Sequence, residues 1–129
     1  MTTDDSDSPV VWAIRLTERA QADLAGAWRY IAGTAGEGMA DAWRTGLRSE
    51  LSTLARLPAR TPVAKESRFF SQPVHKFLYR RTPQGPAYYI LFALETMPED
   101  SPTVRVKHIR HGARAPITRK EAREIEASE

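Results

Sequence analysis

The chain has 129 residues, with 19 lysines and arginines, 16 aspartates and glutamates and no cysteine. This length favours one domain with one hydrophobic core, and the lack of cysteine excludes disulfides, thiolate chemistry and cysteine-ligated zinc. No apolar run is long enough to span a membrane, and the first residues lack the apolar stretch of a signal peptide, so we expect a cytoplasmic protein. We expect a disordered acidic leader over residues 1–9, a single domain over residues 10–116, and a C-terminal helix or tail over residues 117–129.

The first half of the chain predicts a strand followed by two helices. Val10–Leu16 is a short run of β-forming residues. After Thr17, whose side chain can cap a helix, apolar residues recur at helical spacing as far as Gly36. A second stretch with the same spacing covers residues 37–57. Because only a few residues join the two helices, they should form an antiparallel hairpin.

The second half predicts three strands. Residues 59–73 are typical of an irregular segment, with a short strand over residues 68–70 as one interpretation. Residues 74–81 alternate between two faces, which predicts a strand. Residues 87–94 are apolar on both faces, as in a central strand. The last strand lies within residues 103–114.

The C-terminal residues Ile117–Ser128 have high helix propensity, with Thr118 as a cap and Glu121 at capping-box spacing. This helix is weakly apolar, so we expect it to fray or to need a partner. The order β-α-α-β-β-β-α indicates an α+β fold, in which an antiparallel sheet of about four strands packs on the α-helical hairpin. We expect these side chains to be buried between hairpin and sheet: Ala20, Leu24, Trp28, Ile31, Trp43, Leu47, Leu51, Leu54, Ile90, Phe92, Val104 and Val106.

The last strand is unusually basic. By simple alternation, one of its faces carries Val104, Val106 and His108, and the other carries Arg105, Lys107, Ile109 and His111. Residues 56–94 are also basic, with Glu66 as their only acid. If the two segments meet in space, they form a positive surface suited to phosphate or to an acidic protein, although a solubilising face is the simpler interpretation.

The sequence offers few catalytic groups. It has no Gly-rich phosphate loop, no His-Glu-x-x-His motif and no nucleophile elbow. His108 and His111 should point to opposite faces of a strand, which disfavours a metal pair, and we expect no metal or cofactor. A metal-independent ribonuclease would need basic groups plus a general acid and a general base, and His111 could serve as one of these. A hydrogen-bonded structural histidine is the simpler interpretation.

Three short motifs together resemble a known family. The first is Leu16-Thr17-x-x-Ala20-x-x-Asp23-Leu24, followed by Trp28 and Tyr30-Ile31. The second is Phe77-Leu78-Tyr79-Arg80, and the third is His111-Gly112-Ala113-Arg114. In this order and spacing, over Val10–Ala115, they resemble the RelE/ParE toxin superfamily, and the His-Gly-Ala-Arg ending looks more ParE-like than RelE-like.

The resemblance implies the toxin of a type II toxin–antitoxin system, neutralised by a cognate antitoxin with an acidic, partly disordered segment. ParE-like members inhibit DNA gyrase, whereas RelE-like members are ribosome-dependent enzymes that cut mRNA. The resemblance implies contact with DNA only through the antitoxin, and no contact with a membrane. We favour a gyrase inhibitor; the alternatives are an mRNA endonuclease and an inactive interaction or co-repressor module.

The resemblance also implies functional residues. For a ribonuclease these would be Arg80, Arg81, His111 and Arg114. For contact with the target or the antitoxin they would be Arg80, Arg105, Lys107, Arg110, His111, Arg114, Leu24 and Trp28. No tyrosine follows Tyr89, which disfavours the tyrosine-assisted form of the enzyme and favours an inhibitor without enzymatic activity.

Overall fold

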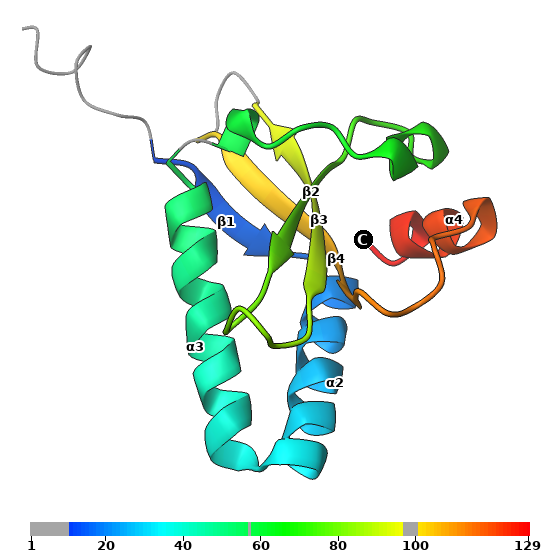
Figure 1. Ribbon diagram of the computed structural model, residues 1–129. Coiled ribbons are helices and arrows are strands. Elements are labelled where there is room, and N and C mark those ends of the chain that lie inside the picture. Colours follow the sequence, from blue (N-terminus) through cyan, green and yellow to red (C-terminus); the bar gives the residue numbers. More distant parts are fainter. Residues whose placement is uncertain (1–10, 57, 97–100) are drawn as a thin grey trace, which may run out of the picture.

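The computed structural model describes residues 11–56, 58–96 and 101–129, so the predicted leader over residues 1–9 lies outside the described residues. The element order predicted from the sequence is confirmed, with two short 3-10 helices added. Figure 1 shows the two long helices side by side and the final helix set apart from them, beyond the sheet. Among the described residues no helix is both long and apolar enough to cross a membrane. The elements are β1 (Ala13–Leu16), α2 (Glu18–Ala35), α3 (Glu37–Leu54), η1 (Pro58–Arg60), η2 (Lys65–Phe69), β2 (His75–Tyr79), β3 (Tyr88–Glu95), β4 (Thr103–His111) and α4 (Arg119–Ala127).

The hairpin of α2 and α3 begins and turns where the sequence predicts. The Thr17 hydroxyl caps α2 by accepting a hydrogen bond from the Ala20 amide at 3.1 Å. Gly36 joins the two helices with a φ of +95°, a conformation that favours glycine. The single-residue connection forces α3 to turn back along α2, as the hairpin prediction requires.

A close approach fixes α3 against β2. A Cβ atom at Gly46 would lie 2.2 Å from the hydroxyl oxygen of Tyr79, so no larger side chain fits there without a shift. The same hydroxyl donates a hydrogen bond to the carbonyl of Trp43 at 2.9 Å. Gly46 therefore lets a buried tyrosine of the sheet anchor to the backbone of the helix.

The sheet has four strands in the order β1-β4-β3-β2. The β2–β3 and β3–β4 pairs are antiparallel, as predicted, whereas β1 pairs in parallel with β4. The parallel pair arises because the whole helical hairpin and two strands separate β1 from β4 in sequence. Only strands joined by a short turn are obliged to run antiparallel.

The main core lies between the hairpin and the sheet. Leu24, Trp28 and Leu54 are only partly buried and pack against its edge. The other nine side chains predicted for the core are buried: Ala20, Ile31, Trp43, Leu47, Leu51, Ile90, Phe92, Val104 and Val106. The helical and strand periods of the sequence thus identified the correct faces.

A second core lies under α4. Ile117, Ala122 and Ile125 are buried against Leu91 of β3 and Val74. The prediction that this helix frays or waits for a partner was wrong, because the chain supplies the partner. The short strand considered for residues 68–70 is also wrong: the 3-10 helix η2 and the residues after it contribute to this second core.

A β-bulge changes which side chains of β4 face the hairpin. Leu91 pairs with His108 and Phe92 pairs with Val106, so Lys107 has no partner in β3. Beyond this extra residue the alternation reverses, and Ile109 joins the main core beside Val104 and Val106. The predicted basic face of Arg105, Lys107, Ile109 and His111 is therefore wrong: Arg105 lies before the bulge, whereas His111 lies beyond it and packs on Tyr88 of the main core.

Candidate functional site

A buried chain of polar side chains crosses β4. The Asp23 carboxylate of α2 accepts hydrogen bonds from His108 Nδ1 at 2.6 Å and from the Ile109 amide at 3.1 Å. Arg110 approaches the other ring nitrogen, His108 Nε2, at 3.3 Å and forms an ion pair with Glu121 of α4 at 2.6 Å. A guanidinium can only donate, so this arrangement requires the imidazole proton on Nδ1. These contacts tie α2 to α4 through His108 and Arg110 of β4, of which Arg110 was predicted to contact the target or the antitoxin.

The two carboxylates at the ends of this chain are held in their charged form. Burial raises the pKa of Asp23, but the bonds from His108 and Ile109 and the charge of Arg19 outweigh burial, so its pKa lies below the ordinary 3.8. Burial also raises the pKa of Glu121, and Arg110 reverses this effect, so that pKa lies below the ordinary 4.5. Both groups are therefore structural anions at neutral pH.

Three of the predicted contact residues are paired within the chain. Lys107 is 1% exposed and pairs with Glu129. Arg110 is 6% exposed, and besides Glu121 it binds the Ala115 carbonyl at 3.1 Å through Nε. Arg105 pairs with Glu95 at 2.8 Å. Lys107 and Arg110 are not available to an external partner while α4 is docked, so the contact role predicted for them does not fit this conformation.

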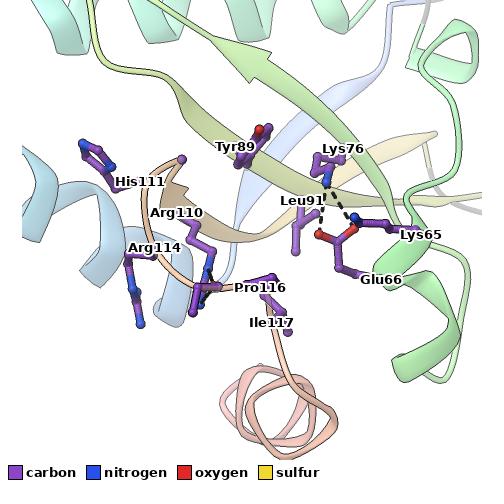
Figure 2. Close-up of a pocket in the computed structure, with 12 residues that line it drawn as sticks. Lys65, Glu66, Lys76, Tyr89, Leu91, Arg110, His111, Arg114, Pro116 and Ile117 are labelled. Atoms are coloured by element: carbon purple, nitrogen blue, oxygen red, sulfur yellow. Dashed lines mark hydrogen bonds and ion pairs between the residues drawn. The ribbon is translucent and has the colours of Figure 1, made fainter.

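A basic pocket of about 170 Å³ lies beside α4 (Figure 2). Tyr89 and Leu91 lie between its two basic sides in Figure 2, where Lys65 and Lys76 are on one side and Arg114 is on the other. Lys76 pairs with Glu66 at 3.0 Å, and its ammonium lies 4.7 Å from the Tyr89 ring centroid. His111 and Arg110 lie on the same side of the pocket as Arg114. The two basic segments of the sequence do meet in space.

Two larger hollows open on the hairpin side of His111. One, of about 430 Å³, lies along α2 and includes Arg114 in its lining. The other, of about 460 Å³, lies between the hairpin and the turn after β2 and includes Arg81. Tyr30, Tyr88 and His111 line both hollows, which therefore form one continuous surface. His111 also lines the basic pocket, so the end of β4 borders all three depressions.

The remaining predicted site residues, Arg80, Leu24 and Trp28, do not line any of the three depressions. Arg80 follows β2 and donates to the Gly85 carbonyl at 2.7 Å across the turn, outside the three depressions described above. Leu24 and Trp28 lie at the rim of the main core. The Trp28 indole donates to Asp41 at 3.0 Å, and Arg44 lies over the same ring. Both residues therefore have structural partners, as their helical periodicity predicted.

The chemistry available at the end of β4 is limited. His108 is fully buried between Asp23 and Arg110. His111 is half-buried, and its Nδ1 accepts a hydrogen bond from the Ala113 amide at 2.9 Å, which leaves Nε2 to face a ligand. Burial raises the pKa of Tyr88 above its ordinary 10.0, so that hydroxyl stays protonated. Within the described ranges no three His, Asp or Glu side chains cluster in a way that could hold a metal ion.

Sequence reasoning missed several residues of these sites. Asp23 stood in a recognised motif, yet its role depends on β4, which lies far along the chain. Lys65 and Lys76 lay in a segment identified only as basic overall. Glu121 was assigned to a capping box, but its side chain pairs with Arg110, and only its amide binds the Thr118 hydroxyl. A signal for this pair is the glutamate content of the C-terminal residues, which follow a basic strand: Glu121, Glu124, Glu126 and Glu129.

Together these features define a class of protein: a small α+β domain with a helical hairpin on its sheet and cationic hollows around the end of its last strand. Comparison with known families identifies this class further. The chain belongs to the family described as ParE toxin of type II toxin-antitoxin system, parDE, whose model matches residues 14–116. No curated protein matches the chain. The family confirms the predicted relation to the RelE/ParE superfamily, the toxin role and the existence of an antitoxin partner.

Proposed function

We propose that this toxin acts in the cytoplasm as a non-enzymatic inhibitor of DNA gyrase and is kept inactive by its antitoxin. The observation that carries the proposal is the pairing of the cations on β4. A metal-independent ribonuclease needs free cations at the scissile phosphate and an acid and a base on either side of it. Here Lys107 and Arg110 are paired with carboxylates of the chain's own C-terminal region, and His108 is buried.

The test compares two activities of one preparation. Purified toxin is added to a gyrase supercoiling reaction and, separately, to ribosomes programmed with mRNA. We expect supercoiling to fall and mRNA to stay intact, and we expect addition of the antitoxin to restore supercoiling. Unimpaired supercoiling at toxin concentrations well above those of gyrase would contradict the proposal.

A second candidate, the ribosome-dependent mRNA endonuclease, is favoured by the basic pocket. Lys65, Arg114 and His111 surround a floor that contains Tyr89, and an aromatic ring between cations is suited to a base and its phosphate. For this candidate, mRNA should be cut at the ribosomal A site, and cutting should be lost in His111→Ala. Arg80→Ala is the matched comparison. Arg80 was suggested by the sequence motifs alone, and it lies outside the three depressions.

A further inference from the structure

The C-terminal helix α4 turns most of its acids toward the toxin and its bases toward solvent. Glu121 pairs with Arg110 at 2.6 Å, and Glu129, just beyond the helix, pairs with Lys107. Glu126 accepts two hydrogen bonds from a serine that follows η2. The helix also carries three bases, all of them exposed: Arg119, Lys120 and Arg123. The charge that this segment presents to the outside is therefore mainly positive.

The three bases gather on one side of the helix. At 3.6 residues per turn, their positions fall within an arc of about 100°. The opposite side carries Ala122 and Ile125, which are buried in the second core. Glu124 is the exposed acid of the helix and lies at the edge of the basic arc. Docking of the apolar side thus fixes the direction in which the bases point.

A fourth base extends this surface onto η2. The guanidinium of Arg68 lies 4.7 Å from the centroid of the Phe69 ring, and that of Arg119 lies 5.2 Å from the same centroid. The two like charges are therefore at most about 10 Å apart, which is about one Debye length in 0.1 M salt. Within the described part of the chain none of the four bases forms an ion pair. We call this set the α4 basic face: Arg68, Arg119, Lys120 and Arg123.

The chemistry of the α4 basic face fits phosphates better than it fits a protein surface. Protein interfaces are anchored by apolar and aromatic side chains. The large apolar side chains that the described residues expose lie outside α4 and η2: Val11, Tyr30, Met39, Val63 and Leu78. Phe69 is half-buried and already contacts two guanidiniums, which disfavours stacking with an unpaired base. Cations without apolar anchors are the groups that contact the backbone of a duplex.

We propose that the α4 basic face binds the phosphate backbone of double-stranded DNA directly and without sequence preference. Figure 1 shows α4 beyond the sheet and away from the hairpin, so this contact leaves the hairpin free. The family model ends at residue 116, so α4 lies beyond the matched residues. The inference goes beyond the proposed function, because it gives the toxin a DNA contact of its own, whereas the family resemblance implied contact only through the antitoxin. Contacts of this kind let a protein move along DNA, which concentrates the toxin near any target that holds DNA.

The test measures binding of the full-length toxin, without antitoxin or gyrase, to a fluorescently labelled DNA duplex of arbitrary sequence. Each phosphate contact contributes about −0.9 to the slope of log K against log salt concentration, so binding should weaken steeply as salt is raised. The double variant Arg119→Gln with Arg123→Gln should reduce the steepness of that slope by about two and weaken binding about tenfold or more in 0.1 M salt. Glutamine preserves helix propensity at both positions.

A matched double variant controls for net charge. Arg29 of α2 and Arg48 of α3 are exposed helical arginines of the hairpin, away from α4. Arg29→Gln with Arg48→Gln removes the same charge and should leave the salt slope nearly unchanged.

A variant with the opposite effect separates lost contacts from a damaged fold. Glu124→Gln removes the exposed acid at the edge of the α4 basic face and should tighten binding about threefold. A damaged fold would not tighten binding. The denaturant midpoint of each variant should stay close to that of the unaltered toxin.

Three results would overturn the inference. The first is no binding of the unaltered toxin to the duplex at low salt. The second is an equal loss of binding in the two arginine pairs, which would mean that net charge alone acts. The third is tighter binding of polyglutamate or of a single-stranded oligonucleotide than of the duplex, which would make the face a site for an acidic protein or for unpaired bases. Because antitoxin and gyrase are absent, failure here leaves the proposed function intact, and failure of the supercoiling test leaves the DNA contact intact.

Discussion

At the scale of single residues, Asp23 shows how one carboxylate can join a helix to a strand. β1 ends at Leu16, so the edge of β4 beyond Val106 has no strand beside it. Asp23 satisfies that edge by accepting the Ile109 amide, and it holds the His108 ring through the same oxygen. The free backbone donor of an unpaired strand edge, which would cost stability if buried alone, is thereby satisfied.

Replacing Asp23 by asparagine should destabilise the fold by about 2 kcal/mol, because the buried His108 and the Ile109 amide lose a charged acceptor. The measurement is the free energy of unfolding from denaturant titration. Asp41→Asn is the matched control, since Asp41 is exposed, and it should cost under about 1 kcal/mol. Equal effects of the two substitutions would mean that Asp23 does not hold the strand edge.

The same residues predict an acid-sensitive fold. The pKa of Asp23 lies below its ordinary 3.8, and those of Glu121 and Glu126 lie below their ordinary 4.5. Each lowered pKa contributes stability that is present above the ordinary value and is lost as the pH falls below it. The denaturant midpoint should therefore drop between about pH 5 and about pH 3, and the drop should be shallower in Asp23→Asn. A denaturant midpoint that falls equally steeply with pH in both proteins would contradict this prediction.

At the scale of elements, α4 is the part whose behaviour sequence reasoning described least well. Its few apolar residues suggested a helix without a fixed position. However, Ile125 and Ala122 are fully buried, and Glu126 accepts two hydrogen bonds from Ser71, at 2.8 Å from the amide and 2.7 Å from the hydroxyl. A weakly apolar helix can dock when its polar side chains also find partners.

Shortening one side chain should loosen that helix. Ile125→Ala should cost about 2 to 4 kcal/mol of docking free energy, since it leaves a cavity in the second core. Amide hydrogen exchange should speed up over α4 and around Lys107, whose partner Glu129 lies just beyond that helix. Glu124→Ala, at an exposed position of the same helix, should leave exchange nearly unchanged. Unchanged protection in Ile125→Ala would show that the apolar contact does not hold α4.

At the scale of the whole molecule, Trp43 links the hairpin to two strands. Its ring contacts Tyr88 of β3 with centroids 4.9 Å apart and Tyr79 of β2 at 6.1 Å. Trp43→Ala should therefore lower the free energy of unfolding by about 3 to 5 kcal/mol, visible as a shifted denaturant midpoint. Leu78→Ala, at a position that is 47% exposed, should change it by under about 1 kcal/mol. A Trp43 effect as small as that of Leu78 would contradict the observed core.

The sequence was sufficient where a feature depends on neighbouring residues. Helical spacing placed Ala20, Trp43 and Leu47 in the core, and Thr17 and Gly36 marked the ends of α2. The parallel pairing of β1 with β4 could not be predicted in the same way, because it brings together segments separated by most of the chain. Periodicity carries no information about such partners.

The candidate site was likewise predictable only where it depends on neighbouring residues. Sequence reasoning correctly brought Arg110, His111 and Arg114 to one end of the last strand. It could not place their side chains, because Lys107 has no pairing partner in β3 and so reverses the alternation of side chains beyond it. A bulge depends on the register of two strands, and a single strand pattern does not reveal it.

The close approach of Gly46 to Tyr79 should also be visible in genetics. Bacteria that express a toxin without its antitoxin grow only if the toxin fails, so surviving colonies report positions that the fold needs. Gly46→Ala should be among the survivors, because its methyl group would lie 2.2 Å from the Tyr79 hydroxyl oxygen. Adding Tyr79→Phe removes that oxygen and should restore growth arrest, so the Gly46→Ala allele has a suppressor 33 residues away that no strand or helix pattern would suggest.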